Sequence, residues 1–152
     1  MSYSQGPSTS LFGSGSASIS AVSSELEQEM FDVLVPHASS RRRWLESMSQ
    51  RISEALTESP DVAVSDETIR MAFDFLLRLP ADAPDPTIVV EPDGEIAFDW
   101  QESPRRMLSV SVGDRGRMGF AALIGVARRY GRLPLTQQTP AEILGYLAQL
   151  RA

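Results

Sequence analysis

Between Thr87 and Ile124 the sequence is TIVVEPDGEIAFDWQESPRRMLSVSVGDRGRMGFAALI, in which turn-forming residues separate four apolar-rich runs. Three of these runs alternate apolar with polar or small residues, which is the period of two that a strand with one buried face requires. We therefore predict a four-stranded antiparallel meander, in which consecutive strands are neighbours joined by short turns.

The predicted turns and the register of this sheet rest on particular residues. Pro92-Asp93-Gly94 has proline for a fixed φ, an aspartate that can bond the turn backbone and a glycine for the left-handed position. Gly113-Asp114-Arg115-Gly116 supplies a second turn. From Glu95 to Trp100, apolar side chains alternate with small or acidic ones, so a slip of one residue would bury two carboxylates. The sequence therefore specifies the register well.

Helical patterns flank the predicted sheet. Apolar residues recur every three to four positions in residues 24–35, 39–59 and 66–79 before it, and in residues 140–151 after it. The residues between the sheet and the last helix, 125–138, are predicted to be a loop.

Capping residues mark the starts of these helices. Ser24 begins a capping box for the first, and Ser65 is the expected N-cap of the third. Thr139 followed by Pro140 and Glu142 is expected to form an N-cap, a first helical proline and a capping box for the last.

The predicted fold class is α+β, with helices covering one face of the four-stranded antiparallel sheet. We expect a single domain over residues 24–152, with helices in 24–79, the sheet in 87–124 and a C-terminal helix in 140–151. A chain of 152 residues with 42% hydrophobic content suits one core of ordinary size. Residues 1–23 consist mainly of Ser, Gly and Thr and are predicted to be a flexible tail.

The composition excludes several kinds of catalytic site. There is no cysteine and no lysine, and His37 is the one histidine, which excludes thiolate catalysis, Schiff-base chemistry and a histidine cluster for zinc. Asp93 and Asp99 are candidates for a carboxylate pair, but roles in a turn and a strand explain them better. We therefore predict that the protein is not an enzyme and has no catalytic residue, metal or cofactor.

The sequence has neither an apolar run of about 18 residues nor a secretory signal, so we expect a cytoplasmic protein without a membrane span.

The net charge of −6 is unevenly distributed along the chain. Residues 1–104 carry 6 Arg and 18 Asp or Glu, a charge of −12, whereas residues 105–152 carry 8 Arg against Asp114 and Glu142, a charge of +6. Two interpretations stay open. The two parts neutralise each other within one fold, or the basic part faces an acidic partner.

These exclusions favour a protein that works by binding another protein, as an antitoxin-like, immunity or adaptor subunit. A tail followed by a short amphipathic helix could become ordered on such a partner. Arginines in the first turn of the second helix oppose the helix dipole, which hints at an acidic partner, although pairing within the chain explains them equally well. The expected contact surface consists of Leu26, Met30, Phe31, Leu34, Arg41, Arg42, Arg43 and Trp44. Association with further copies of the same chain stays open.

A nucleic-acid-binding module is the alternative. In the predicted loop, Arg128, Arg129, Tyr130 and Arg132 interleave basic residues with an aromatic one, a pattern that can bind phosphates and stack a base. A solvated loop explains the same residues, and the acidic net charge makes nucleic acid an unlikely partner.

Several motifs together resemble a group of small bacterial proteins, many of them from compact two-gene modules of the antitoxin or defence kind. These are Pro86-Thr87-Ile88, Pro92 to Ile96 leading into Asp99-Trp100, Leu108 to Val112, and Thr139-Pro140. The resemblance covers residues 65–152 and implies the fold, without implying an active-site residue. A second resemblance is to acidic secretion chaperones, in which helices and strands interleave; the three helices before four consecutive strands depart from that order.

Overall fold

The computed structural model describes residues 38–134 and 139–152. The chain divides into two compact units, Met1–Arg43 and Trp44–Ala152. Of the first unit only residues 38–43 are described, and they are helical. The predicted tail of residues 1–23 and the predicted helix of residues 24–35 lie outside the described residues.

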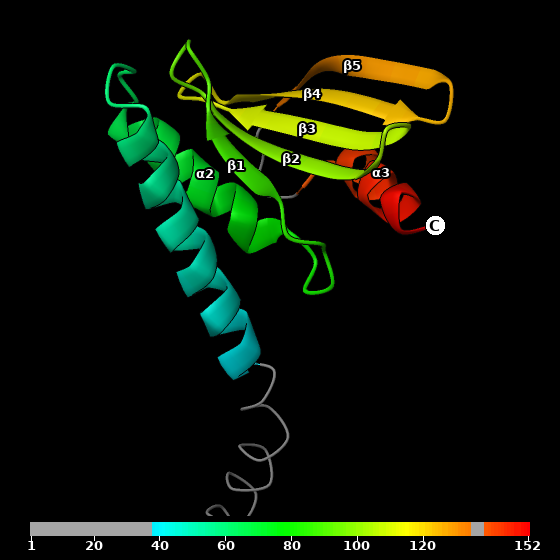
Figure 1. The fold of residues 1–152 in the computed structure, drawn as a ribbon, viewed down its shortest axis with the longest axis horizontal. Helices are drawn as coiled ribbons and strands as arrows, with labels where there is room; N and C mark the ends of the chain where they lie inside the picture. Colours follow the sequence, from blue (N-terminus) through cyan, green and yellow to red (C-terminus); the bar gives the residue numbers. More distant parts are fainter. Residues whose placement is uncertain (1–37, 135–138) are drawn as a thin grey trace, which may run out of the picture. The chain divides into compact units, whose positions relative to one another are not determined.

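The second unit contains an antiparallel sheet whose strands follow one another in chain order, as the predicted meander requires (Figure 1). The sheet has five strands, however, and the prediction of four is wrong. The strands are β1 (Thr87–Val90), β2 (Ile96–Ser103), β3 (Arg106–Val112), β4 (Arg117–Ile124) and β5 (Ala127–Pro134).

The strand that the prediction missed is β5, in the segment expected to be a loop. Six of its eight residues are exposed, so it carries no alternation of buried and exposed residues that hydropathy would reveal. Gly125 and Val126 form the two-residue connection from β4, because Ile124 pairs with Ala127. Gly125 has φ +66°, and positive φ at this position is typical of tight hairpins.

The predicted turn between β1 and β2 is confirmed. Gly94 has φ +88°, its N–H donates to the Glu91 carbonyl, and the Glu91 N–H donates to the Glu95 carbonyl. Asp93 Oδ1 accepts a hydrogen bond from the Glu95 N–H at 3.0 Å. The aspartate therefore bonds the turn backbone as the sequence pattern predicts.

Three described helices accompany the sheet: residues 38–58, α2 (Asp66–Arg78) and α3 (Ala141–Arg151). The predicted N-cap of α2 is confirmed, since Ser65 Oγ accepts from the Thr68 N–H. The predicted capping box of α3 is wrong: Pro140 is the N-cap, and no side chain caps this end. Thr139 Oγ1 instead donates to the Arg78 carbonyl at 3.1 Å, which ties the start of α3 to the end of α2.

The core lies between the helices and one face of the sheet, as predicted. Ile96, Phe98 and Trp100 of β2 are buried on this face. The ring of Phe75 on α2 lies 5.0 Å from that of Phe98, and Tyr146 on α3 lies 5.8 Å from the ring of Phe120. Figure 1 shows α2 and α3 on the same side of the sheet. None of the described helices has the length and apolar composition needed to cross a membrane.

Candidate functional site

The sheet face opposite α2 and α3 is called here the open face. Successive residues of a strand point to opposite faces, so the pairing register assigns each side chain to a face. One row across the open face is Thr87, Asp99, Ser109, Ala121 and Tyr130, with each residue opposite the next on the neighbouring strand. The row beside it is Gln101, Met107, Leu123 and Arg128.

Small side chains hollow out the middle of the open face. Ser109 and Ser111 of β3 lie opposite Ala121 and Gly119 of β4, so the two central strands present little side-chain bulk. A Cβ at Gly119 would lie only 2.8 Å from Ser111 Oγ, so a larger residue would displace the serine. Larger side chains on β5, including Tyr130, stand beside this floor.

Two adjoining hollows follow from this arrangement, and together they form the open-face groove. The first has a volume of about 430 Å³ and the second about 360 Å³. Both are lined by Ser109, Ala121 and Tyr130, so the two hollows adjoin. Met107 and Leu123 add apolar surface to the first hollow, and Glu91 and Arg132 add charge to the second.

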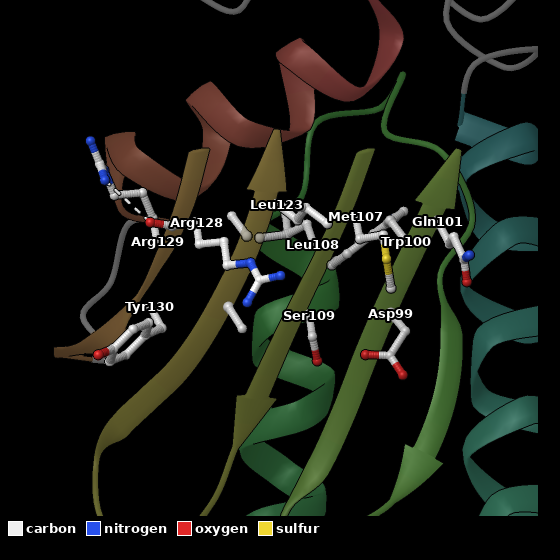
Figure 2. A pocket seen from close by; sticks show the side chains of 12 residues that line it. Asp99, Trp100, Gln101, Met107, Leu108, Ser109, Leu123, Arg128, Arg129 and Tyr130 are labelled. Atoms are coloured by element: carbon white, nitrogen blue, oxygen red, sulfur yellow. Dashed lines mark hydrogen bonds between the residues drawn. The ribbon is translucent and has the colours of Figure 1, made fainter. Parts of the chain in front are cut away.

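The groove has opposite charges at its two sides. Figure 2 shows the Arg128 side chain reaching from β5 across β4 into the groove, whereas Asp99 lies on the β2 side. Tyr130 is 84% exposed and Met107 37% exposed, so both offer large contact surfaces to a partner. An aromatic ring and a guanidinium beside a hollow are the groups that most often anchor protein interfaces.

The arginines of β5 form no ion pair with a carboxylate of the described residues, so they could pair with acidic groups of a partner. Within residues 38–134 and 139–152, no carboxylate forms an ion pair with Arg128, Arg129 or Arg132. The Arg129 guanidinium instead donates to the Arg128 carbonyl at 3.2 Å. Arg151 and Asp82 form an ion pair at 2.7 Å that does join the basic and acidic parts of the sequence.

An acidic cluster lies at the turn between β1 and β2. Carboxylate oxygens of Glu91, Asp93 and Glu95 lie within 4.8 Å of one another, a set that could hold a hard cation. Burial raises the pKa of Glu91, and the charges of Asp93, Glu95 and Asp99 raise it further. Asp93 has a structural role in this cluster, because its carboxylate accepts a hydrogen bond from the turn backbone. Asp99 lies in β2 opposite Ser109 and is not part of the turn that contains Asp93.

The residues predicted to bind a partner are not brought together as one described surface. Leu26, Met30, Phe31 and Leu34 lie outside the described residues, as does His37. Arg41, Arg42 and Arg43 are helical; Arg41 is half-buried, and Arg41 and Arg42 interact with other groups of the chain.

Trp44 has a structural role that the sequence did not reveal. Its ring packs against the hydrophobic core, and its Nε1–H donates to Asp85 Oδ1 at 2.7 Å. This indole therefore fastens the helix of residues 38–58 to the segment that leads into β1.

The residues of the predicted nucleic-acid site, by contrast, are placed together on β5. Arg128, Tyr130 and Arg132 point to the open face, because Tyr130 pairs with Ala121 and the strand alternates. Arg129 points to the other face, where its charge lowers the pKa of Tyr146, although burial and the hydrogen bond to Glu142 raise that pKa overall.

Sequence reasoning missed the groove itself. Ser109, Ser111, Gly119 and Ala121 were visible as small residues on one face of two predicted strands, but a groove needs a wall. That wall is β5, which was expected to be a loop. A glycine at the first position of a two-residue connection, Gly125-Val126, was the signal that could have found it.

Comparisons with protein-family models, with curated proteins and with solved structures found no match to this chain. The resemblance to small bacterial proteins of two-gene modules therefore stays a prediction.

Proposed function

We propose that the protein is a non-enzymatic subunit that binds another protein through the open-face groove. The observation that carries the proposal is Tyr130, an aromatic side chain that is 84% exposed and lines the groove together with Arg128 and the small residues Ser109 and Ala121. The sequence led us to expect an antitoxin, immunity or adaptor subunit, and each of these would work by binding another protein.

The shape of the groove supports a segment of chain as its ligand. The hollows adjoin along β3 and β4, and an extended segment is narrow enough to follow such a groove. Met107 and Leu123 would contact an apolar side chain of the ligand, and Arg128 would pair with an acidic one. The proposed contact surface therefore lies on the sheet, whereas the sequence indicated a surface on the helices.

The experiment blocks the groove with a large side chain. Ala121→Trp places an indole on the floor of the groove, and Ala148→Trp places the same side chain on an exposed position of α3 as a matched control. Peptides are selected from a random display library on the wild-type protein, and their affinities for the three proteins are then compared by fluorescence anisotropy.

We expect the selected peptides to bind Ala121→Trp at least about tenfold more weakly than wild type, since a blocked hot spot costs more than 1 kcal/mol. Ala148→Trp should bind as the wild type does. Equal affinity for all three proteins, or a library that yields no binder, would refute the proposal.

Single-stranded nucleic acid is the second candidate, because Arg128, Tyr130 and Arg132 share one face of β5. Such a face can stack a base on the tyrosine and pair phosphates with the arginines. Affinity for a single-stranded oligonucleotide would then fall steeply as salt rises, and charge reversal at Arg128 and Arg132 would abolish it. No binding at about 50 mM salt, where such contacts are strong, removes this candidate.

A further inference from the structure

We propose that the outer edge of β5 is a second binding site, which takes an acidic segment of a partner protein as an added sheet strand. This site lies at the edge of the sheet, beside the open-face groove, and shares Arg128 and Arg132 with it. An added strand would pair its backbone with that of β5, while its carboxylates pair with the arginines of β5.

The two edges of the sheet differ in what lies beside them. At the β1 edge, Arg51 on the helix of residues 38–58 donates to the Pro86 carbonyl at 3.3 Å and lies 3.8 Å from Asp85. At the other edge, β5 pairs with β4 alone among the described residues (Figure 1). α3 packs against β2, β3 and β4. The backbone groups along the outer side of β5 therefore have no sheet partner within the described part of the chain.

The arginines of β5 indicate the chemistry of the partner. The strand carries Arg128, Arg129 and Arg132 and no acidic residue, and no described carboxylate pairs with them. Because opposite charges on neighbouring strands stabilise a sheet, an incoming strand with carboxylates at matching positions is favoured.

The positions of these arginines favour an added strand over a ligand lying on one face. Arg128 and Arg132 point to the open face, whereas Arg129 points to the face of α3. A nucleic acid on the open face would meet only two of the three charges. A strand beside β5 sends its own side chains to both faces in alternation, so it can meet all three.

A second copy of this chain is a poor occupant of the same edge. If two β5 strands paired antiparallel about Tyr130, Arg128 of one would lie opposite Arg132 of the other. Like charges directly opposite each other destabilise a sheet, so the arginines disfavour self-association while they favour an acidic partner. Pro134 at the end of the strand limits the pairing to Ala127–Leu133, because proline has no N–H.

The test uses a synthetic peptide, Thr-Val-Glu-Val-Thr-Glu-Glu-Val-Thr, whose glutamates match the three arginines in antiparallel pairing. A second peptide has the same sequence but is N-methylated at alternate residues, so it keeps every charge and loses the amide donors that would face β5. The third peptide has lysine in place of each glutamate. Binding to the full chain is measured by anisotropy, and amide hydrogen exchange reports which strand is protected.

We expect the first peptide to bind and to protect amides of β5, and the N-methylated and lysine peptides to bind at least about tenfold more weakly. The triple variant Arg128→Gln, Arg129→Gln, Arg132→Gln should lose affinity similarly, and its far-ultraviolet circular dichroism shows whether it is folded. Ala121→Trp, which fills the groove, should bind the peptide as wild type does.

Equal binding of the N-methylated peptide would overturn strand addition, even if the groove binds its own ligands. Protection of β3 and β4 in place of β5, or loss of binding in Ala121→Trp, would assign the peptide to the groove and likewise overturn the edge site. An oligonucleotide that displaces the peptide and protects the same amides would assign the arginines to nucleic acid.

Discussion

The turn between β1 and β2 requires a residue without a side chain at Gly94. Its φ is +88°, and a Cβ there would lie 2.5 Å from the Ala63 carbonyl oxygen. Gly116 offers a matched comparison, because its φ is +67° but no atom lies within 4 Å of the position of a Cβ. The two glycines therefore separate backbone strain from steric conflict.

We expect Gly94→Ala to destabilise the fold clearly more than Gly116→Ala. Positive φ alone costs an alanine about 1–2 kcal/mol, which is the expected cost at Gly116. At Gly94 the contact with Ala63 adds to that cost, because the neighbour is backbone and cannot rotate away. Urea unfolding of the two variants measures both free energies, and equal costs would show that the loop around Ala63 moves aside without penalty.

Trp44 shows why some site residues could not be predicted from sequence. An amphipathic helix with arginines and a tryptophan at its start fits an interface as well as it fits a core. The hydrogen bond to Asp85, which lies 41 positions away in the chain, and the packing on the core give Trp44 a structural role, and neither is visible in the helix sequence itself. Periodicity identifies the face of a helix but not what covers it.

At the scale of single elements, the β1–β2 turn collects three carboxylates. Burial and its acidic neighbours raise the pKa of Glu91 above its ordinary value, so the folded state takes up a proton at higher pH than the unfolded state does. In the pH window between these two pKa values the folded state binds more protons, and stability falls as pH rises. Glu91 is therefore a destabilising group once it is ionised.

We expect Glu91→Gln to raise the unfolding midpoint at neutral pH and to raise it less as pH falls through that window. Glutamine keeps the size of the side chain and removes the charge that Asp93, Glu95 and Asp99 oppose. Thermal unfolding of wild type and variant in matched buffers between about pH 3.5 and pH 7 spans the usual carboxyl range. A stabilisation that is the same at every pH would show that repulsion at Glu91 is not its cause.

The strands divide into those that sequence predicts and one that it does not. In β2, β3 and β4 one face is buried against helices, so hydropathy alternates and the register follows. In β5 six of the eight residues are exposed, and Arg128, Arg129 and Arg132 keep the strand polar on both faces. β5 is a strand because its backbone pairs with that of β4. The hydropathy of its side chains does not reveal this pairing.

At the scale of the molecule, the charge asymmetry of the sequence is only partly neutralised within the described residues. Arg151 pairs with Asp82, but the arginines of β5 have no carboxylate partner in the described part of the chain. Neutralisation within the fold thus applies to Arg151, whereas an acidic partner for the arginines of β5 stays a proposal. The arginines of β5 lie on the strand that forms both the wall of the groove and an edge of the sheet.

We propose that a partner protein contacts the open face. The most direct measurement is site-specific photo-crosslinking in the organism that makes the protein. A photoreactive amino acid replaces Tyr130 in the groove wall or, as the control, Leu77 on α2, which is 56% exposed. We expect one discrete protein adduct from position 130, none of the same mass from position 77, and loss of the adduct when Ala121→Trp is added. The absence of an adduct at position 130, or the same adduct from both positions, would contradict the claim.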